Sequence, residues 1–193
     1  ITKGIFYYPQ DVEEFSIALI GFQDVDDFSR VAGFYLSALI NNCWGDGIIV
    51  HTADLERLID SLGHQNTKDV TVKGRLGTSA GSEMRCGNLH VIGDVCHRLG
   101  DSATGGTIHV EGNSMSAVGE NLAGAAIIID NDAGDRPGLK MRDGSILIRG
   151  DSGKEVGKWM RGGRIDLLGG YDGISKEILG GEIYHRGARI AKE

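Results

Sequence analysis

Apolar and polar residues alternate in short stretches that return at a nearly constant interval along most of the chain. Each stretch reads apolar-x-apolar, and the successive pairs are Val70/Val72, Leu89/Val91, Ile108/Val110, Ile127/Ile129, Ile146/Ile148, Ile165/Leu167 and Ile183/His185. Alternation with a period of two predicts short β-strands that bury one face. The first members of the pairs lie 19 residues apart, except for a last step of 18. The pattern therefore predicts a repeat protein with one such strand in every unit.

Glycine follows the same interval. One series closes the apolar stretches, with Asn131 in its fourth place, and a second falls in the following bend: Gly74, Gly93, Gly112, Gly150, Gly169, Gly187, and Gly81, Gly100, Gly119, Gly138, Gly157. The chain has 31 glycines but only 2 prolines, which is unlike a Gly/Pro-rich linker. Glycine at fixed corners permits a positive φ or a close backbone approach. We expect these glycines to be structural.

A unit of 19 residues is too short to enclose its own core, so the units must stack on one another. Stacked coils of short strands, about 4.8 Å apart, form a parallel β-helix. The sequence therefore predicts a mainly β fold, in which residues 70–193 form a parallel β-helix with coils of about 19 residues.

Residues 1–69 have a different pattern. Apolar positions between Val25 and Ile40 recur every three or four residues, which predicts an amphipathic helix, with Asp24 and Asp26 as N-cap candidates. An open β-helix end exposes core side chains and unpaired backbone groups, so it needs a cap. We interpret residues 1–69 as an α-helical capping segment; a functional helical domain is the alternative.

Two further elements are expected inside this segment. Ile48–Val50 predicts a first, irregular strand, and Ala53–Leu62 predicts a short second helix that ends before Gly63.

Composition excludes several classes of protein. A formal net charge of −7 disfavours a nucleic-acid-binding surface. No apolar run is long enough to cross a membrane. Cys43, Cys86 and Cys96 form no CxxC pair and no metal-ligand spacing, which indicates free thiols in the cytoplasm.

The segment 149–163, RGDSGKEVGKWMRGG, contains fragments of three known motifs: Arg-Gly-Asp, a protease-like Gly-Asp-Ser-Gly, and Gly-Lys pairs. Ser152 nevertheless aligns with Val95, Ser114 and Ala133 of the other units. This position of the repeat therefore requires a small or apolar residue, not a nucleophile. Gly153-Lys154 lacks the Ser/Thr that follows a phosphate-binding loop. The segment is interpreted as one coil of the repeat, and no catalytic residue is predicted.

The alternation also predicts which side chains face outward. His90 and His109 should lie on adjacent coils about 5 Å apart, which makes them weak metal-ligand candidates with Glu111 beside them; an exposed histidine ladder is the alternative. Four outward aliphatic residues indicate a face covered by the N-terminal segment, a second copy or another subunit: Ile92, Ile128, Leu147 and Leu168.

Acidic residues in the predicted bends are expected to accept backbone N–H bonds: Asp143, Asp151, Asp166 and Asp172. The last coil loses one residue within Gly169–Ser175, which indicates a C-terminal cap or one specialised loop.

The repeat, as in GGRIDLLGGYDG and MRDGSILIRGDSGKEVGKWMRGG, resembles the GXGXG repeat over Val70–Ile190. That repeat builds the C-terminal domain of the glutamate synthase large subunit and the C subunit of formylmethanofuran dehydrogenase. The resemblance implies a right-handed β-helix that holds the catalytic parts of a redox enzyme together and binds no cofactor itself.

Two functions follow as expectations. The first is a non-catalytic scaffold that assembles with itself or with other subunits of a redox complex. The second is a stand-alone enzyme or a small-ligand or metal binder that uses a groove on one β-helix face, with His90 and His109 in it.

Overall fold

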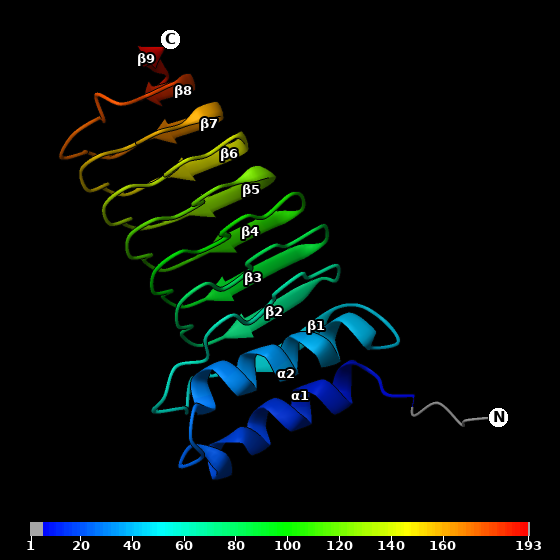
Figure 1. Cartoon of the computed structure of the whole chain (residues 1–193). Coiled ribbons are helices and arrows are strands. Elements are labelled where there is room, and N and C mark those ends of the chain that lie inside the picture. Colours follow the sequence, from blue (N-terminus) through cyan, green and yellow to red (C-terminus); the bar gives the residue numbers. More distant parts are fainter. Residues whose placement is uncertain (1–5, 193) are drawn as a thin grey trace.

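The computed structural model describes residues 6–192 and shows a stack of parallel strands with helices at one end (Figure 1). The helical elements are α1 (Pro9–Ala18), the 3-10 helix η1 (Leu19–Phe22) and α2 (Phe28–Asn42). The strands are β1 (Ile48–His51), β2 (Val70–Lys73), β3 (Asn88–Ile92), β4 (Thr107–Val110), β5 (Ala123–Ile129), β6 (Asp143–Ile148), β7 (Arg161–Leu167), β8 (Gly180–His185) and β9 (Ala188–Lys192). Strands β1 to β8 pair in parallel and in chain order, and β9 pairs antiparallel with β8. The predicted mainly β, parallel-strand solenoid with a helical cap is confirmed.

The strand columns have the predicted register. Ile108 pairs with Ile127, and Ile127 pairs with Ile146, so residues 19 apart lie directly above one another. Ile127 is 1 % exposed and Ile146 is 0 % exposed, whereas the intervening residue Ile128 is only partly buried. The alternation therefore separates core-facing from outward side chains in every coil.

The turns before strands β2 to β7 each hold three left-handed residues at alternate positions. In one coil these are Ser79, Gly81 and Glu83, with φ of 60°, 65° and 54°. The Ser79 N–H donates to the His97 carbonyl of the next coil, and the Gly81 N–H donates to the Leu62 carbonyl of the preceding coil, each at 2.8 Å. The alternating conformation thus directs successive N–H groups to the two neighbouring coils, and the second glycine series lies at its middle position.

The two helices close the β1 end of the stack (Figure 1). Helix α1 packs on β1, where the His51 N–H donates to the Ser16 hydroxyl at 3.0 Å. Helix α2 lies on the turn of the first coil: a Cβ at Gly33 would come within 1.6 Å of the Asp60 carbonyl oxygen, so only glycine fits there. The Ser37 hydroxyl accepts the Gly63 N–H at 3.0 Å.

Three details of the N-terminal segment differ from the sequence predictions. Ala53–Leu62 is not a helix, because Ser61 and Gly63 have φ of 58° and 77° and the chain forms the same left-handed turn as the other coils. Asp24 and Asp26 are not N-caps; α2 starts after Asp27, which makes no side-chain cap bond. Helix α1 was not predicted.

Candidate functional site

The outward face of the strand stack is the most distinctive surface that the sequence pointed to. The middle residues of successive strands form one column, in which His90 and His109 are followed by Ile128 and Leu147. The residues two positions later form the neighbouring column, which includes Ile92, Glu111, Asp130 and Leu168. Because the coils are in register, residues widely separated in the sequence form one continuous face.

The two histidines are stacked as predicted. Their ring centroids lie 5.0 Å apart and their planes differ by 8°. His90 Nε2 lies 2.9 Å from Glu111 Oε1, and His109 Nε2 lies 2.9 Å from Asp130 Oδ2. Each ring is thus paired with a carboxylate from the next coil instead of pointing at a shared ligand position.

These pairs do not assemble a metal centre. Within residues 6–192, no group of three or more His, Cys, Asp or Glu side chains is arranged to hold a metal ion. The Asp130 carboxylate is also held by Arg149, whose Nη1 lies 2.5 Å from Oδ1. The geometry of this face favours a histidine–carboxylate ladder over the metal-site hypothesis.

We expect the double substitution His90→Ala/His109→Ala to lower the free energy of unfolding by less than about 2 kcal/mol, because each solvent-accessible pair contributes about 0–1 kcal/mol. Urea unfolding followed by circular dichroism measures this change. Addition of Zn²⁺ should leave the melting temperature of the unsubstituted protein unaltered. A zinc-dependent rise in melting temperature that the double variant abolishes would contradict the ladder interpretation.

The outward aliphatic residues are not covered by the chain itself. Ile92 and Leu168 are 41 % and 45 % exposed, and Ile128 and Leu147 are partly buried among their neighbours on the sheet. The helices lie beyond β1, at the opposite end of the stack from β6 and β7 (Figure 1). The hypothesis that the N-terminal segment covers this face is therefore wrong.

A second apolar surface, which the sequence analysis missed, lies on the helical cap. Its most exposed members each leave more than half of the side chain accessible: Ile17, Ile20, Phe22, Val25, Val31 and Tyr35. Several of them line an apolar hollow of about 130 Å³ together with buried Phe28 and Ala32. Helix α2 thus has apolar residues on two faces, one toward the core and one toward solvent, and its sequence pattern had been read as a single core-facing stripe.

The protease-like motif is structural. Ser152 is 4 % exposed and pairs in the strand-like column with Ala133 and Tyr171. Its hydroxyl has no hydrogen-bond partner among residues 6–192. A buried hydroxyl with no base beside it cannot act as an activated nucleophile.

The acidic residues of the bends have divided roles. The Asp151 carboxylate accepts the Gly170 N–H at 2.6 Å, and Asp143 accepts the Gly144 N–H at 2.7 Å, as expected. Asp166 is different: it lies within β7, between the core-facing Ile165 and Leu167, and its carboxylate pairs with Arg164 Nε at 2.6 Å instead of accepting a backbone N–H. No hydrogen bond of the Asp172 side chain is found in the described part of the chain.

A ladder of Asp and Asn side chains that was not predicted lies in the corners after strands β3 to β6. Asp94 Oδ1 accepts the Asn113 N–H at 2.7 Å, and Asp132 Oδ1 accepts the Asp151 N–H at 2.7 Å. The signal was present, because Asp94, Asn113, Asp132 and Asp151 also recur every 19 residues.

The three cysteines are free and separate. Cys43 is buried in the cap, and burial raises the pKa of its thiol. Burial likewise raises the pKa of Cys96, whereas Cys86 is exposed. Raised thiol pKa values disfavour a nucleophilic role for Cys43 and Cys96.

Comparison with known proteins adds no family assignment. A scan against models of protein families finds no match to this chain, and a search of curated proteins finds no significant match either. In residues 6–192, no helix has both the length and the apolar character needed to cross a bilayer.

Proposed function

We propose that this chain is a non-catalytic β-helix scaffold that assembles through the outward face of its strand stack. The observation that carries the proposal is the outward aliphatic group Ile92, Ile128, Leu147 and Leu168. Ile92 and Leu168 are exposed, Ile128 and Leu147 are partly buried by their neighbours on the sheet, and the helical cap lies beyond β1 (Figure 1). Apolar side chains on the outer face of a sheet are costly in water and are typical of surfaces that contact another protein. The exposed apolar residues of the cap add a second surface of the same kind.

The repeat resemblance supports a particular type of partner. In glutamate synthase and formylmethanofuran dehydrogenase the similar domain joins catalytic parts without binding a cofactor. The proposed assembly is therefore a homo-oligomer or a complex with subunits of a redox enzyme of that type, in the cytoplasm.

We expect the double substitution Ile128→Glu/Leu147→Glu to dissociate this assembly and leave the fold intact, because two carboxylates would be desolvated in the interface. Light scattering after gel filtration of the purified protein measures self-association. Affinity purification from the native cells, with mass spectrometry of stoichiometric partners, tests for redox-enzyme subunits.

The control is Ile128→Val/Leu147→Met, which keeps the face apolar and should retain the assembly. Circular dichroism and the melting temperature verify that both variants fold. A protein that stays monomeric at high concentration and binds no redox-enzyme subunit would refute the proposal, as would an assembly that both double variants retain equally.

A further inference from the structure

A cavity of about 340 Å³ opens among the turns that precede strands β5 to β8. It is lined by three cations, one amide and two apolar side chains: Lys140, Arg142, Arg161, Asn121, Trp159 and Leu179. A hollow of about 420 Å³ adjoins it, and Lys140 and Trp159 line both. The cavity volume lies within the range of about 300–1,000 Å³ that is usual for small-molecule sites.

The repeat geometry concentrates the cations. Lys140 occupies the last left-handed position of its turn, and Arg142 follows two residues later, at the entry of β6. Trp159 and Arg161 occupy the equivalent positions of the next coil. Because adjacent coils stack in register, the two arginines come from neighbouring coils and line the same cavity.

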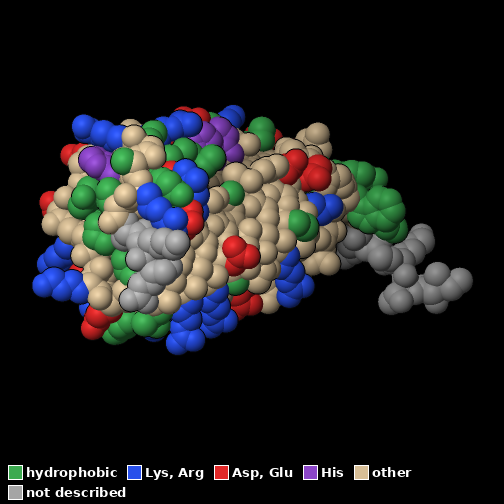
Figure 2. All heavy atoms as spheres, turned by 90° about the horizontal axis from the view of Figure 1, so that it is seen from above, with side chains coloured by type: hydrophobic (Ala, Val, Ile, Leu, Met, Phe, Trp, Pro, Cys, Tyr) green, Lys and Arg blue, Asp and Glu red, His purple; other side chains and the backbone are tan. Residues whose placement is uncertain are grey.

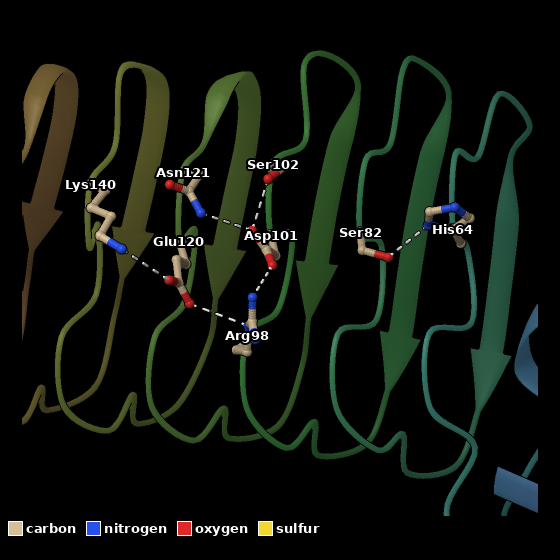
Figure 3. Close-up of polar contacts among 8 residues, drawn as sticks. All are labelled: His64, Ser82, Arg98, Asp101, Ser102, Glu120, Asn121 and Lys140. Atoms are coloured by element: carbon tan, nitrogen blue, oxygen red, sulfur yellow. Dashed lines mark hydrogen bonds and ion pairs between the residues drawn. The ribbon is translucent and has the colours of Figure 1, made fainter. Parts of the chain in front are cut away.

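This positive cluster contrasts with the net charge of −7 of the whole chain. Lys140 Nζ lies 4.0 Å from Glu120 Oε1, and Glu120 also contacts Arg98 Nε at 3.3 Å (Figure 3). Within residues 6–192, neither Arg142 nor Arg161 forms an ion pair with a carboxylate. The space-filling view shows Lys and Arg side chains in several groups on the surface, with acidic side chains beside some of them (Figure 2).

Trp159 is an exposed aromatic residue at the last left-handed position of its turn. Its φ is 56°, a left-handed conformation that costs a residue with a bulky side chain about 1–2 kcal/mol. Its side chain is nevertheless 41 % exposed, with Lys158 Nζ 5.1 Å and Lys140 Nζ 5.8 Å from the ring centroid. The left-handed φ belongs to the turn itself, but an exposed tryptophan ring close to two lysines is a feature that core packing does not explain.

We propose that this cavity binds a small organic anion. Its carboxylate or phosphate group would pair with Arg142 and Arg161, which offer planar donor groups suited to such oxygens. Its apolar body would lie against Trp159 and Leu179. The site is separate from the proposed assembly face, so each proposal can fail without the other.

The test uses Trp159 as its own reporter. The chain has 2 tryptophans, and Trp44→Phe leaves only Trp159. Phenyl phosphate, benzoate, inorganic phosphate and phenol are titrated, with fluorescence and calorimetry as independent readouts. We expect phenyl phosphate or benzoate to bind with a Kd of about 1 mM or tighter. The probe that binds more tightly shows whether the site prefers a phosphate or a carboxylate group. Phenol lacks the charge and inorganic phosphate lacks the apolar body, so each should bind about tenfold more weakly.

Matched arginine variants locate the site. Arg142→Gln and Arg161→Gln should each weaken binding of the preferred probe by about tenfold, through loss of a charge-assisted bond. Arg85→Gln is the control, because Arg85 occupies the equivalent position three coils before Arg142 and does not line the cavity. Circular dichroism confirms that each variant folds. The proposal is overturned if neither aromatic anion binds at about 10 mM, if phenol binds equally well, or if Arg85→Gln weakens binding as much as Arg161→Gln.

Discussion

Ile146→Ala should lower the free energy of unfolding by about 2–5 kcal/mol, the usual cost of truncating a fully buried aliphatic side chain. Ile146 is 0 % exposed and lies in the middle of the stack, between Ile127 of β5 and Ile165 of β7. Truncation of the Ile146 side chain leaves a cavity that is lined by the coils on both sides. Urea unfolding of the purified variant, followed by circular dichroism, measures the change.

The neighbouring residue supplies the control. Leu147 points outward, so Leu147→Ala should cost within about 1 kcal/mol in a verified monomer. Equal destabilisation by the two changes would mean that the inward and outward assignment is wrong. If neither change affected stability, the stacked-coil core itself would be in doubt.

Gly144→Ala should destabilise the fold by about 2–5 kcal/mol, which combines the strain of a left-handed alanine with the cost of overpacking. Gly144 has a φ of 95°, and a Cβ there would come within 2.3 Å of the Ala125 carbonyl oxygen of the coil before it. That oxygen belongs to the backbone, so it cannot move aside without disturbing the stack. Thermal and urea unfolding measure the loss.

Gly173→Ala is the matched change. A Cβ at Gly173 would meet nothing within 4 Å, and its backbone is outside the left-handed region. We expect its stability to stay within about 0.5 kcal/mol of the unsubstituted protein. Comparable losses at Gly144 and Gly173 would show that close approach between coils does not restrict these corners.

The solenoid was predictable because its period is carried by many columns at once. Strand register and the direction of each side chain follow from alternation and spacing alone, as Ile146 and Leu147 illustrate. The first coil was harder. Leu55, Ile59 and Leu62 recur at helical spacing, but they are buried in a segment that is not helical. The left-handed conformation at Ser61, in the turn of this segment, has no counterpart in the hydrophobic pattern.

The candidate sites were predictable to different degrees. The outward aliphatic and histidine columns follow directly from alternation. The cationic cavity does not, since its lining comes from separate coils and periodicity carries no information about depth. Arg142 and Arg161 are 19 residues apart and were visible as a column; that they line a cavity with Trp159 depends on how the turns stack.

The constant spacing of the middle coils restricts how the length of this chain can change in evolution. From β2 to β7 paired residues lie 19 positions apart, except for Ala123 and Asp143, which are 20 apart at an irregularity, and the 18-residue step occurs only between β7 and β8. A single-residue insertion inside a middle strand would turn each following outward side chain toward the core. Duplication or loss of a complete coil would preserve every column. Related chains should therefore differ by whole coils, and their stacks should lengthen or shorten in steps of about 4.8 Å.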